Sequence, residues 1–174
     1  MESLPDPLLQ EQLTLRTELE ISRQMDDIIL KIQGIAKRFS IASEDPKSPF
    51  KNVLAAATES NASIESIKSY IRYQVGRSGA SRIWKLSKDK KLFATAVVEH
   101  IDNLSQDAQE ILKRVRKSIP KENPLENYLT DTQNQAQFIK IIHLKLTRLY
   151  LGYLAREHTA MAGEEKANKN ESQA

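Results

Sequence analysis

The chain has 174 residues and a mass of 19.8 kDa, with 40% hydrophobic and 28% charged residues, a composition typical of one folded domain and not of a disordered chain. The chain has only 5 Gly and 6 Pro, and this low number of turn-forming residues disfavours an all-β fold. Because it has 0 Cys, disulfides, thiolate metal sites and cysteine nucleophiles are excluded. No apolar run reaches the roughly 18 residues of a membrane helix, and the first residues are acidic, so we expect a cytoplasmic protein with no membrane partner.

The net charge of +3 is distributed unevenly along the chain. Residues 1–46 carry 5 basic and 9 acidic residues, residues 68–91 carry 8 basic and 1 acidic, and residues 105–121 carry 5 basic and 2 acidic. A concentrated positive stretch in a nearly neutral chain indicates a polyanionic partner. A solvated helix face is the alternative, and the charge count alone does not separate the two.

The first half of the chain is predicted to be helical. Apolar residues recur at helical spacing over 7–39, with an irregularity between Arg16 and Arg23 where the helix could break. Residues 40–48 form a connection, and Ser48 with Pro49 is predicted to start a second helix. A third helix, capped within 61–63, has one apolar face and ends near Gly76 and Gly79.

The second half continues the helical pattern. We expect a short helical stretch over 81–86, helices over 87–104 and from Ser105 to about 119, and a strongly apolar helix over 132–159. Residues 162–174 have nothing to bury and are predicted to form a disordered tail. The fold class is therefore all-α, a compact bundle of about five to six helices. Its expected parts are an acidic helical segment (1–46), the bundle core (47–161) and the tail (162–174).

The sequence contains no recognisable catalytic pattern. Two of the three histidines, His100 and His158, follow a glutamate directly, and adjacent residues on a helix point about 100° apart, so neither pair converges on one atom. His143 lies in the most apolar helix, where a core or boundary role is favoured. Metalloprotease, phosphate-loop and serine-hydrolase motifs are missing. We expect no enzyme activity, no catalytic residue, no metal and no cofactor.

Two basic clusters lead to different interpretations. The cluster at 113–117 lies near a helix C-terminus, where the helix dipole favours cations. Lys88, Lys90 and Lys91 are predicted to lie in the first turn of a helix, where the dipole disfavours cations, so they are more consistent with a phosphate site. The full set of predicted nucleic-acid-binding residues is Arg72, Arg77, Arg82, Lys85, Lys88, Lys90 and Lys91.

The aromatic residues near this stretch are compatible with two roles. Tyr70 and Tyr73 share a helix face with Arg77 and could stack on bases or pack on a neighbouring helix. Trp84 is predicted to be a packing anchor.

One stretch of the chain resembles a known family. The segment Ile71-Arg72-Tyr73-Gln74-Val75-Gly76-Arg77, then Lys90-Lys91-Leu92-Phe93, then a hydrophobic helix rich in Leu and Tyr, resembles the small subunit of type III (Csm-type) CRISPR effector complexes. The likeness covers roughly residues 55–158. The acidic segment 1–46 and the connection 78–88 are longer than the family pattern, which indicates a related type III subtype.

The resemblance implies a non-catalytic, helical RNA-binding subunit that acts in antiviral defence. Its implied partners are the guide RNA and target RNA, the large and backbone subunits of a CRISPR effector, and further copies of itself. By position, Arg77, Lys90 and Lys91 would face the nucleic acid, with Arg72, Arg82, Lys85 and Lys88 as helpers. A stand-alone helical nucleic-acid-binding regulator is the alternative, and a metal-dependent nuclease is a further competing class.

Overall fold

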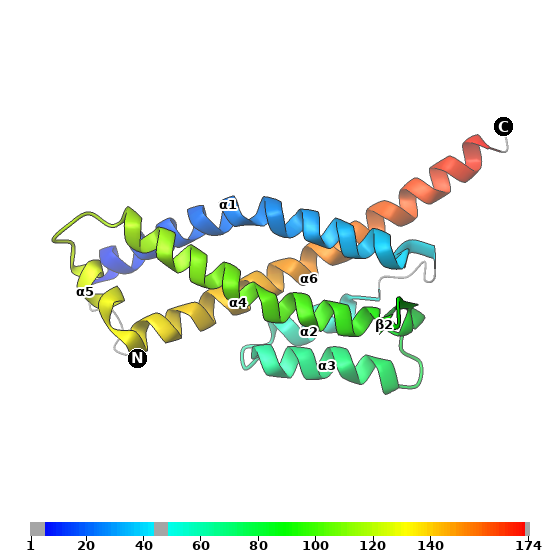
Figure 1. Cartoon of the computed structure of the whole chain (residues 1–174), viewed down its shortest axis with the longest axis horizontal. Coiled ribbons are helices and arrows are strands. Elements are labelled where there is room, and N and C mark those ends of the chain that lie inside the picture. Colours follow the sequence, from blue (N-terminus) through cyan, green and yellow to red (C-terminus); the bar gives the residue numbers. More distant parts are fainter. Residues whose placement is uncertain (1–5, 44–48, 173–174) are drawn as a thin grey trace. The chain divides into compact units, whose positions relative to one another are not determined.

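The computed structural model describes residues 6–43 and 49–172, and the all-α class is confirmed (Figure 1). In the described residues the α-helices are α1 (Pro7–Phe39), α2 (Lys51–Thr58), α3 (Ile64–Gly76), α4 (Phe93–Ser118), α5 (Pro124–Thr130) and α6 (Thr132–Glu171). The remaining elements are two 3-10 helices, η1 (Ile41–Ser43) and η2 (Arg82–Lys85), and a two-stranded hairpin of β1 (Ser87–Lys88) and β2 (Lys91–Leu92).

The described residues divide into two compact units, each drawn from separate stretches of the chain. Unit 1 comprises 6–27 and 103–146, and unit 2 comprises the described residues of 28–102 together with 147–172. Helices α1, α4 and α6 each contribute to both units. The predicted parts followed composition along the sequence, whereas these units follow contacts in space.

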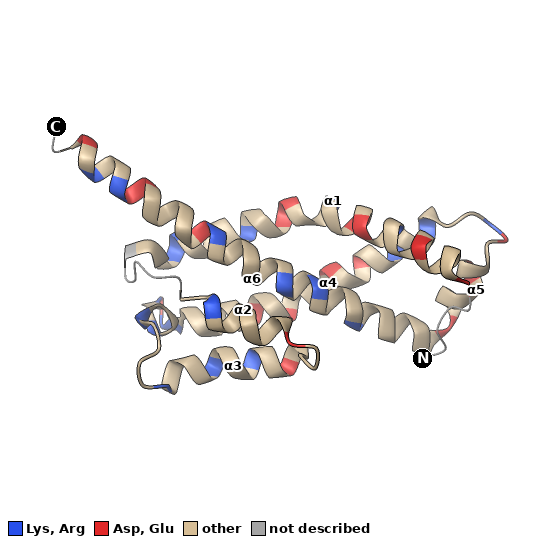
Figure 2. Cartoon of the chain, turned by 180° about the vertical axis from the view of Figure 1, so that it is seen from behind, with Lys and Arg blue, Asp and Glu red and all other residues tan. Residues whose placement is uncertain are grey.

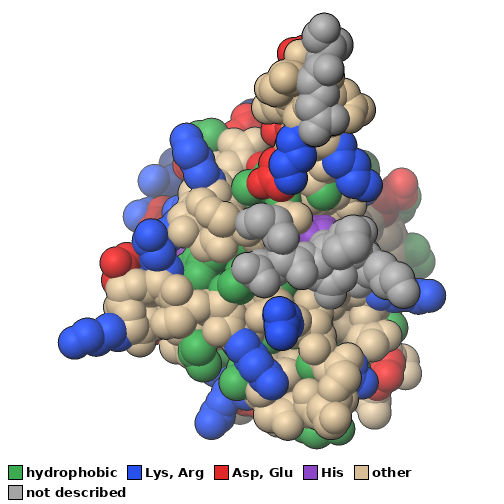
Figure 3. All heavy atoms as spheres, turned by 90° about the vertical axis from the view of Figure 1, so that its right-hand side faces the viewer, with side chains coloured by type: hydrophobic (Ala, Val, Ile, Leu, Met, Phe, Trp, Pro, Cys, Tyr) green, Lys and Arg blue, Asp and Glu red, His purple; other side chains and the backbone are tan. Residues whose placement is uncertain are grey.

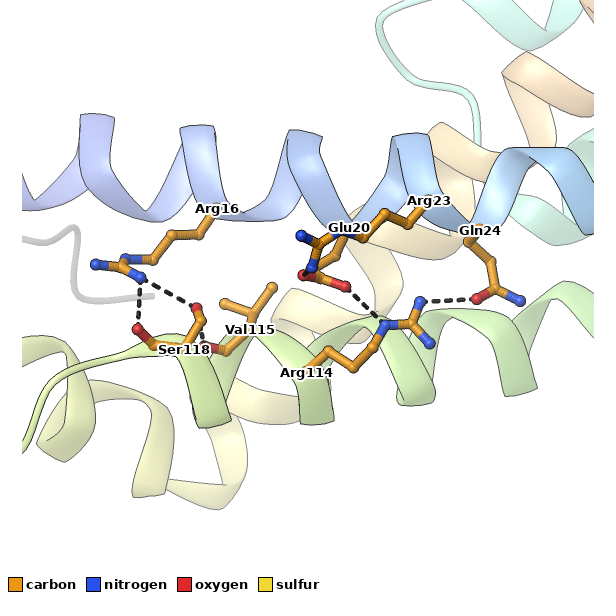
Figure 4. Close-up of polar contacts among 7 residues, drawn as sticks. All are labelled: Arg16, Glu20, Arg23, Gln24, Arg114, Val115 and Ser118. Carbon is orange, nitrogen blue, oxygen red and sulfur yellow. Dashed lines mark hydrogen bonds and ion pairs between the residues drawn. The ribbon is translucent and has the colours of Figure 1, made fainter.

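In unit 1, α1 and α4 run antiparallel. Arg16 of α1 donates to the carbonyl of Ser118 at 2.5 Å, while Arg114 of α4 donates to Glu20 and to Gln24, each at 2.7 Å (Figure 4). Partners later on α1 therefore lie earlier on α4, which defines the antiparallel direction. Glu20 is buried, so this polar layer is part of the packing between the two helices.

In unit 2, an aromatic cluster forms the centre of the core. Trp84 of η2 is 1% exposed and packs edge-on against Phe50, with ring centroids 5.4 Å apart, and against Phe93 of α4 at 5.7 Å. Phe39 and His158 contact the same cluster. The predicted role of Trp84 as a packing anchor is confirmed.

Helix α1 has no break between Arg16 and Arg23. The buried stripe continues through this stretch, but polar Thr17 and Glu20 occupy two of its positions. The Thr17 hydroxyl donates to the carbonyl of Leu13 at 2.6 Å, and the Glu20 carboxylate is ion-paired. The apolar spacing of this stretch is irregular in the sequence because hydrogen-bonded polar residues occupy two of its core positions, and not because the helix breaks.

The prediction of a helix starting at Ser87 was wrong. Residues 87–92 form the β1–β2 hairpin, in which Asp89 and Lys90 have φ of 51° and 63°. The Phe93 N–H donates to the Leu86 carbonyl at 2.8 Å and extends the hairpin ladder to the start of α4. A two-residue turn with positive φ at both positions is the standard way to join such strands.

The predicted separation of two helices at Leu104 and Ser105 was also wrong, since α4 runs unbroken from Phe93 to Ser118. Ile101, Leu104 and Ala108 are all buried, so one apolar stripe passes through the expected junction. Ser105 is an interior residue of α4 and not a cap.

Helix starts and ends elsewhere were predicted with mixed success. Ser63 caps α3 in a reciprocal capping box with Ser66, as the sequence indicated. Ser48 lies outside the described residues, and α2 begins at Lys51. The tail predicted to be disordered is helical up to Glu171, because alanine, glutamate and lysine have high helix propensity and the helix continues from the packed part of α6. Within the described residues, none of the helices has both the length and the apolar character needed to cross a bilayer.

Candidate nucleic-acid interface

The β1–β2 hairpin of unit 2 carries the densest group of predicted site residues, and Lys and Arg gather around it (Figure 2). Lys88 and Lys91 are directly paired across the two strands, and Asp89 and Lys90 form the turn between them. Three lysines therefore occupy four consecutive positions of one tight turn. Because they precede α4, they do not oppose the dipole of its first turn, and that part of the sequence reasoning was wrong.

The hairpin has two local costs of its own. Like charges directly opposite one another on adjacent strands are destabilising. A lysine with a φ of 63° adopts a left-handed conformation that favours Gly or Asn. Strained backbone and unfavourable charge pairing concentrate at functional sites, so both costs make this turn a candidate site.

Two ion pairs tie the hairpin to neighbouring helices of unit 2. Asp89 pairs with Arg38 of α1 at 3.0 Å, and Lys91 pairs with Glu99 of α4 at 2.6 Å. All four side chains are at least one third exposed, so each pair contributes little to stability. The pairs fix the position of the turn, and Lys91 is partly neutralised by its partner.

Four further cations in this segment have no acidic partner among the described residues. They are Arg82, Lys85, Lys88 and Lys90, and all four are exposed. Figure 3 shows exposed Lys and Arg side chains on the face seen from the right-hand side of Figure 1, the side on which β2 is labelled. A group of unneutralised cations on a short surface segment produces a local positive potential that attracts polyanions.

Arg77 lies at the C-cap of α3, where its N–H donates to the Tyr73 carbonyl at 3.0 Å. Its side chain is partly buried, and its Nε has no hydrogen-bond partner in the described part of the chain. A buried N–H without an acceptor costs free energy. An oxygen-rich ligand would remove that cost.

Arg72 lies in a different place from the hairpin cations. It is exposed on α3 and lines a separate depression of about 390 Å³ between α3 and α4. In that depression Lys68 pairs with Asp102 at 2.7 Å and Glu65 at 2.9 Å, and hydrogen bonds to these two carboxylates raise the pKa of Lys68. Arg72 thus shares its depression with two carboxylates and one lysine, away from the hairpin cations, and is the weakest of the predicted site residues.

Two cations that line a small pocket beside the hairpin were not predicted. The pocket, of about 300 Å³, brings Lys31 and Arg38 of α1 together with Lys91, Glu99 and His100. Lys31 and Arg38 belong to a stretch that is acidic on average, and nothing in the sequence indicates that these two cations lie beside Lys91. Only the packing of α1 on α4 could have revealed them.

His100 is held by a buried tyrosine. The Tyr150 hydroxyl and His100 Nδ1 are 3.0 Å apart. Burial lowers the pKa of His100, and the nearby Lys31 and Lys91 charges lower it further, while Glu99 raises it. Burial also raises the pKa of Tyr150, so its hydroxyl stays protonated. His100 is therefore a neutral residue whose proton affinity depends on the charge of the hairpin.

The two tyrosines of α3 lie against each other, with ring centroids 6.1 Å apart. Tyr73 is 57% exposed and Tyr70 is half-buried. The exposed ring of Tyr73 is available to stack on a base, while Tyr70 supports it from one side.

The remaining sequence predictions concern metal sites and relatives. Among the described residues no group of three or more His, Asp or Glu side chains could hold a metal ion, and His143 is half-buried in α6. Comparisons with protein-family models, curated proteins and solved structures gave no match to this chain. The family resemblance stays a prediction.

Proposed function

We propose that this chain is a non-catalytic RNA-binding subunit of a ribonucleoprotein, similar in role to the small subunit of type III CRISPR effector complexes. In this role it contacts the duplex of guide RNA and target RNA through phosphates, together with the large and backbone subunits. The all-α fold is compatible with that role, but the proposal depends on the hairpin region. We define the hairpin region as Arg77, Arg82, Lys85, Lys88, Lys90 and Lys91.

The observation that carries the proposal is the set of four exposed cations without acidic partners on η2 and the hairpin. A folded protein gains no stability from such a group, and the opposed pair of Lys88 and Lys91 is a local cost. Phosphates of a nucleic acid would neutralise these charges. Release of counterions from the RNA then drives binding.

Lysines and arginines on a hairpin tip recognise phosphates rather than base edges. Lys88 and Lys90 lie on the hairpin and not on an α-helix, and the deep, narrow major groove of A-form RNA does not admit side chains to its base edges. Binding by this region is therefore expected to be indifferent to sequence. That property suits a subunit of a complex in which base pairing with a guide reads the sequence.

The test is a titration of a fluorescently labelled RNA duplex with the full chain at two salt concentrations. The hairpin variant, Lys88→Gln with Lys90→Gln, should weaken binding by roughly tenfold and make the logarithmic salt dependence shallower by about two. The matched control is Arg116→Gln with Lys117→Gln. It removes two exposed cations from α4 that have no acidic partner in the described part of the chain. This control should bind RNA as the wild type does.

Unchanged RNA affinity in the hairpin variant would contradict the proposal. A strong preference for one sequence at constant salt would favour the stand-alone regulator instead. Genes for the large and backbone subunits beside this one, and co-purification of the chain with their products, would support the assignment to a CRISPR effector.

The absence of activity is tested separately. The purified chain with Mg²⁺ or Mn²⁺ is expected to cut neither RNA nor DNA. Cleavage that survives repurification and is lost on substitution of one carboxylate would establish a nuclease.

A further inference from the structure

Unit 1 contains a second basic region, a groove of about 590 Å³ formed by the end of α4, by α5 and by the start of α6. One rim carries Lys113, Arg116 and Lys117 of α4, and the other rim includes Glu126 of α5. The sequence reasoning assigned these cations to the dipole of the helix C-terminus. The dipole explains why cations are tolerated there, but it does not explain the groove beneath them.

The cations of this rim differ in how they are neutralised. Lys113 pairs with Glu110 at 3.6 Å, and both side chains are exposed. Arg116 and Lys117 are exposed and have no acidic partner among the described residues. Arg114, within the same run, instead points to α1 and donates to Glu20 (Figure 4). The rim therefore keeps two charges available to a ligand.

The floor of the groove is aliphatic. Leu112 and Leu129 are buried beneath it, while Ile119 and Ile139 are half-buried along it. The described residues that line the groove include no aromatic side chain. Bases of single-stranded RNA are held mainly by stacking on aromatic rings or guanidinium planes, so an aliphatic floor favours aliphatic side chains over bases.

We propose that this groove binds an acidic amphipathic segment of another protein, with Leu, Ile or Val anchors on the floor and Asp or Glu opposite Arg116 and Lys117. The groove is lined by both aliphatic and charged side chains, and its volume suits a short peptide, either a helix of a few turns or an extended segment of a few residues. Apolar anchors and charge complementarity would hold such a peptide. This inference concerns unit 1 and does not depend on the RNA-binding role of unit 2.

The experiment uses the full chain and a labelled peptide of about 15 residues, in which leucines at helical spacing alternate with glutamates. One control peptide has lysine in place of each glutamate, and a second has alanine in place of each leucine. We expect binding of the first peptide only. The groove variant, Arg116→Gln with Lys117→Gln, and the floor variant, Ile139→Gln, should each weaken it by roughly three- to tenfold. The hairpin variant should leave it unchanged.

Other outcomes would overturn the proposal. Equal binding of the peptide to the groove variant would place its site elsewhere. Loss of affinity for the RNA duplex in the groove variant would make this groove part of an RNA surface. A mass that rises with protein concentration in the wild type and not in the groove variant would identify a second copy as the occupant. Failure of the hairpin variant to lose RNA binding would contradict the RNA proposal alone.

Discussion

The hairpin region and the groove of unit 1 contain similar cations on very different supports. In the hairpin region, Lys88 lies on the short strand β1, Lys90 lies in the two-residue turn, and both side chains are exposed. In the groove, Arg116 and Lys117 stand on a long helix beside an aliphatic floor. A run of positive charge in a sequence therefore does not define a ligand. The surface around the charges decides whether phosphates or an acidic peptide fits better.

The two regions also differ in what the cations cost the folded protein. Lys88 faces Lys91, and Lys90 has a left-handed backbone, so the hairpin is locally unfavourable. The cations at the end of α4 are favoured by the helix dipole. Removing hairpin cations should therefore weaken binding while leaving stability unchanged or higher. Removing cations at the end of α4 should leave RNA binding unchanged while stability stays the same or falls slightly.

The largest expected effect comes from the core beneath the hairpin. Trp84→Ala should lower the free energy of unfolding by about 3–5 kcal/mol, because it removes a fully buried ring that contacts Phe50 and Phe93. Chemical denaturation measures this loss, and Tyr73→Ala, at an exposed ring, is the control with little change. In the chain that remains folded, hairpin amides should exchange faster and RNA affinity should fall. Unchanged exchange of those amides would show that Trp84 does not support the hairpin.

A smaller loss is expected within the basic run of α4. Arg114→Gln should lower the free energy of unfolding by about 2 kcal/mol, because it leaves the buried Glu20 carboxylate without this partner. Arg116→Gln, two residues further on, should change stability by at most about 0.5 kcal/mol. Thermal melts of the two variants give the comparison. Similar losses in both would mean that Arg116 has a structural partner as well, and the groove would lose one of its free charges.

Much of this fold could be predicted because helices depend on local signals. The capping box of Ser63 and the apolar face of α3 are both readable within a few residues. The hairpin could not be predicted in this way, since Lys90 is not a typical residue for a turn with positive φ. The continuity of α1 was not predicted, because two of its core positions are polar. Thr17 donates to the Leu13 carbonyl one turn earlier, and Glu20 pairs with Arg114, which only the fold brings near.

The candidate sites were less predictable than the fold for the same reason. The lysines of the hairpin were predicted as site residues from their density and from an expected position in the first turn of a helix. That position was wrong, and their role stays a prediction. Lys31 and Arg38 could not be connected with Lys91, because the separation along the chain is bridged only by packing. The groove was not predicted because its floor combines Ile119, directly after the end of α4, with Ile139 of α6.

At the β1–β2 turn, the substitution Lys90→Gly is expected to raise stability and to weaken RNA binding. Lys90→Gly removes a left-handed strain of about 1–2 kcal/mol and adds roughly 0.5–1 kcal/mol of backbone entropy loss, so stability should rise by up to about 1 kcal/mol. RNA affinity should fall, since one cation is removed. Lys90→Gln is the matched control, with the same loss of RNA binding and no gain in stability. Lower stability in Lys90→Gly would mean that the lysine side chain makes a stabilising contact.

The smallest expected effect is a change in the proton affinity of His100, which can report on the hairpin region. Its pKa lies below the ordinary value of about 6.5, because of burial first and the Lys31 and Lys91 charges next. The unfolded chain therefore binds this proton more readily, so the stability that His100 contributes is present above about pH 6.5 and is lost as the pH falls through its folded pKa.

Phosphates bound beside Lys91 would offset the positive charge near His100 and should raise its pKa. An NMR titration of the His100 ring, with and without the RNA duplex, measures the change. Lys91→Gln should raise the pKa in the free chain, because it removes one cation and leaves Glu99 unpaired by it. The groove variant should leave the His100 titration unchanged in both conditions. If RNA does not raise the pKa of His100, the bound phosphates lie away from Lys91, at other cations of the hairpin region.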